Sequence, residues 1–383
     1  MKEIGVFGLI GNIPGLLQAT SVKEEEQLIL LAGPYLQQIE FPVYKVCCVF
    51  NQPCFAWLEL VDDQGNVLQK IYEEYDGMRQ ANTDKFQFIC KVDHHVVNYR
   101  IAAKEIKQFD PYKIEYGKEW KGEIHSVETA AEDVVEHRVL ILNDIHEQPD
   151  SYRELYEMSA LKNPHLVLIN GDSFHYVTTQ QDLVDKLLKP VTDVFATKVP
   201  FIMVRGNHET RGKFARDFKS YFAYPDDKFY QAFRMGSVFW IVLDGGEDKP
   251  DSHEVYAGTV DYDAYRLAQR AWLKEVLASQ AFKDARFRIV VNHIPFFHSD
   301  EWHGTLHNRE CFHDLLNEAR VNAVISGHTH DYGFYPPNNE HAYHVIIGGG
   351  PKVGTRAFVE VKSTKDDLSI ILKKDDGTTL GKL

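Results

Sequence analysis

The chain lacks several features that would decide its class at once. Only five of its 383 residues are cysteine and none form a Cys-X-X-Cys pair, so neither a disulfide framework nor a zinc ribbon is indicated. No stretch of about 20 apolar residues occurs, and we expect no transmembrane segment. Basic residues are in deficit, with 42 Lys and Arg against 56 Asp and Glu and a net charge of −14. Because a nucleic acid polymer is recognised through a basic face, we expect none as a partner.

The N-terminus has some features of a targeting segment. Residues 4–17 are mostly apolar, and Ala19-Thr20-Ser21 fits a small-residue cleavage site, although Glu3 cancels the charge of Lys2. The charged residues 22–27 are typical of a linker. We interpret residues 1–29 as a leader or a disordered linker. A leader would place the protein in the periplasm or outside the cell, and the alternative is a cytoplasmic protein.

Residues 30–125 carry strand signals with few helical periods between them, which predicts a small antiparallel β-sandwich. A break containing Pro53 separates the first two strands, and a turn is expected at Asp93-His94-His95. Four of the cysteines fall in this region, where buried free thiols are expected and one disulfide stays open. The predicted strands are residues 43–50, 55–61, 86–92 and 96–102.

From about residue 136 to the C-terminus at 383, apolar runs alternate with helix-like stretches, the pattern of a layered α/β domain. The predicted strands are residues 138–142, 166–169, 201–204, 238–243, 287–291 and 323–325. The predicted helices are residues 150–161, 181–195, 262–278 and 309–319.

Five of the apolar runs end in a polar cluster. Ligands collect beyond the carboxyl ends of strands in open α/β sheets, so these clusters indicate one site. Taken singly, such residues are more often a helix cap, a turn, or a core or surface histidine. Side chains two apart on an extended segment point the same way, and this would let Asp144 and His146 converge. The clusters are Asp144-Ile145-His146, Gly171-Asp172, Gly206-Asn207-His208-Glu209, Asn292-His293 and Gly327-His328-Thr329-His330.

The clusters supply carboxylate, amide and imidazole donors but no thiolate. This donor set suits two divalent or trivalent metal ions such as Mn, Fe or Zn. Seven donors are too many for one ion, whereas two ions can share a bridging group. Two such ions outweigh two Asp carboxylates, so the site would attract phosphate. The candidate metal ligands are Asp144, His146, Asp172, Asn207, His293, His328 and His330.

The ordered pattern DxH, GD, GNH(E/D), H and GHxH resembles that of the calcineurin-like metallophosphoesterase superfamily, over roughly residues 136–362. The resemblance implies a two-sheet α/β sandwich flanked by helices. It also implies the role of each matching residue: His208 would touch the scissile phosphate or protonate the leaving oxygen. Asp144, His146 and His330 would hold the first ion, Asn207, His293 and His328 the second, and Asp172 would bridge them.

The N-terminal part is similar to the fibronectin-III-like domain of purple acid phosphatases, on the residues Pro34-Tyr35-Leu36-Gln37. That family has Gly at the position of His146 and a ligating Tyr at that of His175. Without this tyrosinate we expect no purple Fe(III) charge-transfer band. The expected fold class is thus α/β, with a two-sheet βαβ sandwich metallophosphoesterase domain at residues 136–383 preceded by a small all-β sandwich domain at residues 30–125.

Four further residues are candidates for catalysis or substrate binding. Arg211 could bind a substrate phosphate or instead pair with Glu209 or Asp217. His175 could contact phosphate or pack beneath the site. The run at residues 244–248 could line the cleft, but we interpret it as a solvated turn. Trp302 and His303 are candidates for a wall of the substrate pocket.

The sequence therefore predicts a dinuclear-metal-dependent phosphoesterase for a small phosphorylated substrate, either a phosphomonoester or a phosphodiester. In this mechanism the ions acidify a bridging water, and the hydroxide attacks phosphorus opposite the leaving group. The alternative is a metal-loaded binding or adhesion protein with vestigial catalysis. The N-terminal domain would serve as a spacer or as a wall on the substrate side.

Overall fold

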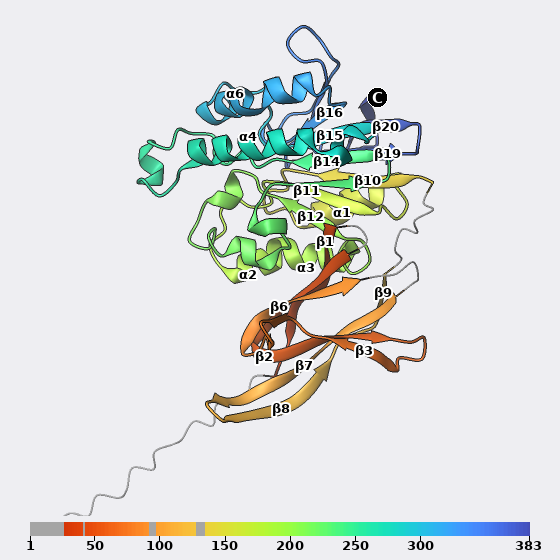
Figure 1. Cartoon of the computed structure of the whole chain (residues 1–383), viewed down its shortest axis with the longest axis vertical. Coiled ribbons are helices and arrows are strands. Elements are labelled where there is room, and N and C mark those ends of the chain that lie inside the picture. The colour runs from red at the N-terminus through yellow and green to blue at the C-terminus, as the bar shows by residue number, and fades with distance from the viewer. Residues whose placement is uncertain (1–26, 41–42, 92–96, 128–134) are drawn as a thin grey trace, which may run out of the picture.

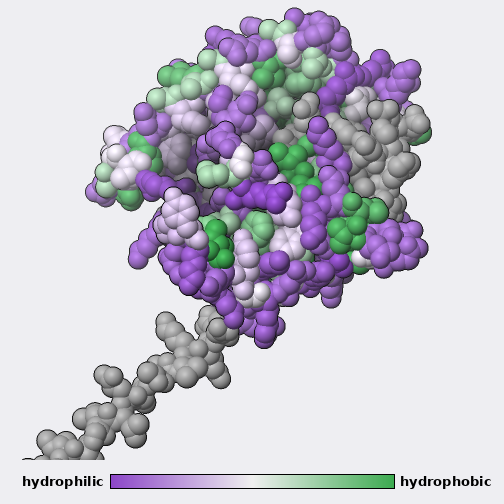
Figure 2. Space-filling model, turned by 60° about the horizontal axis from the view of Figure 1, so that its bottom comes forward, coloured by the Kyte–Doolittle hydropathy of each residue, from purple (hydrophilic) through white to green (hydrophobic). Residues whose placement is uncertain are grey.

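The computed structural model describes residues 27–40, 43–91, 97–127 and 135–383. The segment considered as a leader, up to residue 26, and the predicted turn at residues 93–95 lie outside these ranges. Within them, no helix combines the length and the apolar character needed to cross a membrane. The face seen in Figure 2 is mostly hydrophilic, with small separate apolar patches.

The C-terminal part is built in layers that confirm the α/β fold class (Figure 1). Helices α4 (Tyr262–Ala278) and α6 (His303–Glu318) cover one sheet, and helices α1 (Asp150–Met158), α2 (Gln180–Leu183) and α3 (Lys189–Val191) cover the other. Turns of π-helix lengthen the α2–α3 region, so that residues 180–196 form the continuous helix that the sequence predicts there. A short helix, α5 (Gln280–Lys283), follows α4.

In the described part of the chain, the larger sheet runs in the order β21-β20-β19-β10-β11-β12-β1-β2-β7-β8, with β3 and β6 also paired to β2 and β9 to β7. Its C-terminal members are β10 (His137–Leu142), β11 (Leu166–Asn170), β12 (Phe201–Val204), β19 (Ala357–Ser363), β20 (Leu368–Lys374) and β21 (Thr379–Lys382). Its N-terminal members are β1 (Leu30–Glu40), β2 (Val43–Val61), β3 (Val67–Ile71), β6 (Thr83–Lys91), β7 (Val97–Asp110), β8 (Lys113–Lys121) and β9 (His125–Val127).

The second sheet runs in the order β13-β14-β15-β16-β18-β17. Its strands are β13 (Gln231–Met235), β14 (Val238–Val242), β15 (Phe287–Val291), β16 (Ala323–Ser326), β17 (Gly333–Tyr335) and β18 (His344–Ile347). A separate hairpin is formed by β4 (Glu74–Tyr75) and β5 (Met78–Arg79).

The six strands predicted in this part of the chain are present, and those at the centre of each sheet run parallel. β10, β11 and β12 pair in parallel, as do β14, β15 and β16. Such strands are covered on both faces, which is why they read as unbroken apolar runs. Between the two sheets lie Ile141, Leu168 and Val204 from one and Trp240 and Ile325 from the other. Because parallel strands end at a common edge, the polar clusters that follow them are brought together.

Several boundaries differ from the sequence predictions: α1 ends at Met158 and not at 161, and β7 continues to Asp110 and not to 102. Two further differences have a clear physical reason. α6 begins at His303, six residues before the predicted helix, because Gly304, Thr305 and Asn308 are buried on its inner face and interrupt the apolar periodicity. β2 is one strand rather than two. The predicted break around Pro53 is a shift of register between Val49 and Cys54, where the partner of β2 changes from β6 to β7.

The N-terminal strands have a core of their own, which includes Phe50, Phe86, Phe88, Tyr99 and Ile101. All five cysteines are buried and free, and this confirms the expectation of free thiols. The fibronectin-III-like character of this region stays a prediction.

β1 joins the N-terminal strands to the layered part of the chain. It pairs with β2 in an antiparallel manner and with β12 in a parallel manner, at Gln37 and Phe201. The hydroxyl of Tyr35 donates to the backbone oxygen of Tyr221 at 2.7 Å, and Tyr35, Cys47 and Phe201 belong to the same core. The N-terminal region is therefore more than a detachable spacer.

We predict that removal of residues 1–125 destabilises the remainder, because it uncovers the edge of β12 and the core around Phe201. Burial of one large apolar side chain contributes about 1.5–3 kcal/mol. In a domain of this size each kcal/mol corresponds to about 2–4 °C of melting temperature. Thermal unfolding and size-exclusion chromatography would detect the effect.

Removal of residues 1–26 alone is the control, because it leaves all of these contacts in place. A chain starting near residue 136 that is soluble and melts like the full-length protein would contradict the prediction.

Candidate metal centre

The seven residues predicted as metal ligands meet at the carboxyl edges of the two sheets. Asp144 and Asp172 follow β10 and β11, and His293 follows β15. Ligand atoms of Asp144, His146, Asp172 and His330 all lie within 4.8 Å of one another. Ligand atoms of Asp172, His293 and His328 form a second such group. Asp172 belongs to both groups, which is the position required of a bridging carboxylate.

The amide of Asn207 belongs to the second group through its oxygen. Asn207 Oδ1 lies 2.9 Å from Nδ1 of His328. In the first group, Nε2 of His330 and Nε2 of His146 are 2.8 Å apart, so both nitrogens face the same small volume. Asp172 lies between the two groups: its Oδ2 is 3.6 Å from Nε2 of His146 in the first group and 3.1 Å from Nε2 of His293 in the second.

The backbone reaches this arrangement through left-handed conformations. The φ angles are 52° at Asp144, 43° at His146, 54° at Asp172, 74° at His328 and 58° at His330. Asp144 and His146 therefore converge as predicted, but through left-handed backbone conformations and not through an extended segment. Each such conformation costs roughly 1–3 kcal/mol, and they cluster at functional sites.

Contacts between the loops hold these conformations. Backbone N–H groups of Asp144 and His146 donate to the carbonyls of Gly171 and Asp172, at 3.1 and 2.9 Å. The N–H of His328 donates to both carboxylate oxygens of Asp144. Neither Gly206 nor Gly327 could carry a side chain, because a Cβ would overlap the carboxylate of Asp172 or of Asp144, respectively.

Two side chains outside the predicted ligand set, the acid Glu209 and the amide Asn143, orient the site. The buried carboxylate of Glu209 accepts the N–H groups of Asp172, Ser173 and Gly206, at 2.9, 2.7 and 2.8 Å. Asn143 donates to Asp144 Oδ2 at 2.8 Å and to the carbonyl of Gly349 at 3.0 Å. Glu209 belongs to the cluster Gly206-Asn207-His208-Glu209, but the sequence does not show that it accepts these backbone N–H groups. Nothing in the sequence marked Asn143.

The buried carboxylates of the centre carry negative charge, which favours the binding of cations. Burial by itself would raise the pKa of Asp172, but the imidazole of His293 and then those of His208 and His146 hold it well below its usual range. Burial lowers the pKa of His293, whereas Asp172 raises it more, to about 10. In the described part of the chain, the charged partners of both Asp144 and Asp172 are imidazoles.

The orientation of His293 fits metal binding. Its Nδ1 donates to the carbonyl of Asn170 at 2.7 Å, which leaves the lone pair on Nε2 facing Asp172. This buried Nε2 has no hydrogen-bond partner among the described residues. A buried nitrogen base beside a buried carboxylate is costly unless a proton or a metal ion lies between them. The residues present therefore fit a metal ion.

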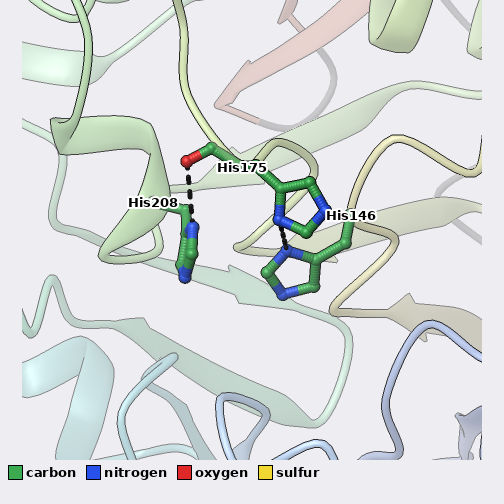
Figure 3. Close-up of side chains that lie close together, drawn as sticks. All are labelled: His146, His175 and His208. Atoms are coloured by element: carbon green, nitrogen blue, oxygen red, sulfur yellow. Dashed lines mark hydrogen bonds between the residues drawn. The ribbon is translucent and has the colours of Figure 1, made fainter.

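His208, Arg211 and His175 surround the first group. In Figure 3 the ring of His208 reaches the carbonyl oxygen of His175, with Nδ1 donating at 3.0 Å, and the rings of His175 and His146 meet at 3.3 Å between Nδ1 atoms. Nη1 of Arg211 lies 3.1 Å from Nε2 of His208. The partner of Arg211 is Glu247, to which Nε and Nη2 donate at 2.7 and 2.8 Å, and neither Glu209 nor Asp217.

The interpretation of residues 244–248 as a solvated turn is wrong. Asp244 and Glu247 are fully buried. Their carboxylates can be buried because Asp244 pairs with Arg205 and Glu247 pairs with Arg211. The turn is a rigid support that aims Arg211 at the centre.

Trp302 and His303 lie at the start of α6. Trp302 is half exposed, and Nζ of Lys249 lies 5.6 Å from the centre of its ring. His303 faces Asp263 on α4 instead of the metal ligands. A substrate-binding role for either residue stays a prediction.

Comparison with known proteins agrees with this geometry. The sequence profile described as calcineurin-like phosphoesterase matches residues 137–332, about half of the chain. The chain belongs to the calcineurin-like phosphoesterase family.

Similar curated proteins include plant and animal phosphatases. The chain is 31% identical to purple acid phosphatase 22 of Arabidopsis thaliana over 198 residues, which are 48% of this chain and 43% of that protein. It is 24% identical to the serine/threonine-protein phosphatase CPPED1 of Homo sapiens over 252 residues, 55% of this chain and 74% of that one. The chain thus matches less than half the length of the Arabidopsis relative.

Among solved structures, purple acid phosphatase PPD1 from yellow lupin seeds has a similar fold. The TM-score is 0.66 at 14% identity, over 91% of this chain and 73% of that one. The likeness covers most of the chain and confirms the expected fold class.

We predict that Glu209→Gln weakens metal binding by this phosphoesterase about ten- to a hundredfold, the usual cost of losing a group that orients metal ligands. A glutamine amide turns a donor toward backbone N–H groups that need an acceptor. Equilibrium dialysis with elemental analysis measures the affinity. Glu254→Gln is the matched control because Glu254 is exposed, and equal metal affinity in the two variants would contradict the assignment.

Proposed function

We propose that this phosphoesterase is a metal-dependent hydrolase acting on a small phosphorylated substrate, either a phosphomonoester or a phosphodiester. The observation that carries the proposal is the pair of ligand groups that share Asp172. A single shared carboxylate between two sets of imidazoles supports a dinuclear centre rather than two independent sites.

In this proposal, metal ions of the Mn, Fe or Zn type are held by the seven residues in the groups described above. Asp144, His146 and His330 would hold one ion, Asn207, His293 and His328 would hold the other, and Asp172 would contact both. When bound, two such ions bind phosphate oxygens and acidify a water molecule for attack on phosphorus.

His208 is the residue to which we assign the leaving group. Its Nδ1–H is fixed by the carbonyl of His175, so that Nε2 faces the centre, 3.9 Å from Asp172 Oδ2. Once a phosphate oxygen takes Nη1 of Arg211 away from Nε2, a proton on Nε2 would pass to the departing oxygen. Because Glu247 holds the other two nitrogens of Arg211, the Nη1 group beside His208 is the one left to bind a phosphate oxygen.

We propose the domain boundaries at residues 30–125 and 136–383, on the separate cores of the two parts. The apolar segment at residues 4–17 supports export of the protein as a further proposal.

We predict turnover of a monoester or a diester by the Mn-loaded protein at neutral pH. Phosphomonoesters, phosphodiesters and pyrophosphates would be compared by phosphate or alcohol release. Full metal content with no turnover of any of them would instead favour the binding or adhesion protein with vestigial catalysis.

We predict that His208→Ala lowers kcat for an alkyl phosphate by about 10²- to 10⁴-fold, the usual contribution of a general acid. The loss should be much smaller for p-nitrophenyl phosphate, because nitrophenolate leaves without a proton. Metal content should stay unchanged, and His253→Ala serves as the histidine control. An equal loss with both substrates would exclude His208 as the proton donor.

A further inference from the structure

A second cluster of His and Asp side chains lies between α4 and α6. It consists of Asp263 in the first turn of α4 and of His303 and His307 in the first two turns of α6. Their ligand atoms all lie within 4.8 Å of one another, and none of the three belongs to the metal centre described above. We call this cluster the α4–α6 site.

The three side chains converge in the way that metal ligands do. Nε2 of His303 lies 2.8 and 3.0 Å from the two carboxylate oxygens of Asp263, and Nδ1 of His307 lies 3.0 Å from Oδ1. The two histidines are four residues apart on one helix and share a face. Their rings are nearly parallel, at an interplanar angle of 18°.

We propose that the α4–α6 site binds one Zn(II) ion. Two imidazole nitrogens and one carboxylate oxygen are the protein ligands of many zinc sites, in which water fills the fourth position. The side chains are reachable from solvent, with exposed fractions of 39% for Asp263, 36% for His303 and 15% for His307.

Groups around the cluster orient these ligands. Nε2 of His307 lies 3.7 Å from the thiol sulfur of Cys311, so an N–H on that side leaves the lone pair of Nδ1 directed at Asp263. The buried Arg266 donates from Nη1 to Asp263 Oδ1 at 2.9 Å and from Nε to the carbonyl of Gly245 at 2.8 Å. The carboxylate is thereby fixed in place. Because Arg266 is positively charged, we expect the α4–α6 site to bind a cation with lower affinity than the main centre.

The position of the site connects it to the turn that supports Arg211. The N–H of Gly304 donates to the carbonyl of Asp248 at 2.7 Å, one residue after Glu247. The N–H of Asp263 donates to the carboxylate of Asp251 at 2.9 Å. An ion that joins α4 to α6 would therefore hold the segment from Asp248 to Asp251, which directly follows Glu247.

The test compares Zn(II) content per chain in the full-length protein and in the double variant His303→Ala, His307→Ala, after dialysis against the same micromolar free Zn(II). We expect one ion fewer per chain in the double variant. The control is His313→Ala, which removes a half-buried imidazole from the same helix and should keep the full content. We also expect Zn(II) to raise the melting temperature of the wild-type protein more than that of the double variant.

Equal Zn(II) content in the wild-type protein and the double variant would overturn the proposal. If the double variant does not fold, Asp263→Asn replaces it, with the same expected loss of one ion. The difference between proteins is the readout, so it does not depend on how many ions the main centre holds. The same comparison in a His293→Ala background would still differ by one ion, even if the proposed function were wrong.

Discussion

The buried carboxylate of Asp172 is the constraint on which the centre depends. It is 1% exposed, and its charged neighbours are imidazoles rather than a lysine or an arginine. An ionised carboxylate in such surroundings costs several kcal/mol unless cations compensate it. The sheets, the tight approach of Gly206 and the three N–H groups held by Glu209 all keep Asp172 where two ligand sets can reach it. The fold thus holds a buried negative charge that is balanced either by protonated imidazoles, chiefly His293, or by bound metal ions.

Much of this arrangement was accessible from the sequence. Buried parallel strands are short apolar runs, and a run such as residues 201–204 was therefore located to the residue. The polar clusters were recognisable because each follows its own strand, and parallel strands deliver them to one edge. Both inferences need only local sequence and one rule of sheet geometry.

The remainder depended on contacts between distant parts of the chain. The left-handed backbone at Asp144 and His146 exists because the next loop, at Gly171 and Asp172, accepts their N–H groups. Arg211 finds Glu247, 36 residues away, and this pairing is what turns residues 244–248 into a buried support. The early start of α6 has the same cause, since its first turn is packed by neighbours and carries no apolar periodicity of its own. Periodicity and spacing report which residues are local neighbours, whereas these features are set by tertiary partners.

The two clusters of metal-binding type differ in what their surroundings already provide. At the main centre Asp144 and Asp172 are buried, and imidazoles are their charged partners among the described residues. At the α4–α6 site Asp263 already has Arg266, and solvent reaches all three ligands. The carboxylates of the main centre are shielded from water, whereas the carboxylate of Asp263 is stabilised by both solvent and Arg266. Loss of metal should therefore disturb the fold around Asp172 and leave the helices around Asp263 in place.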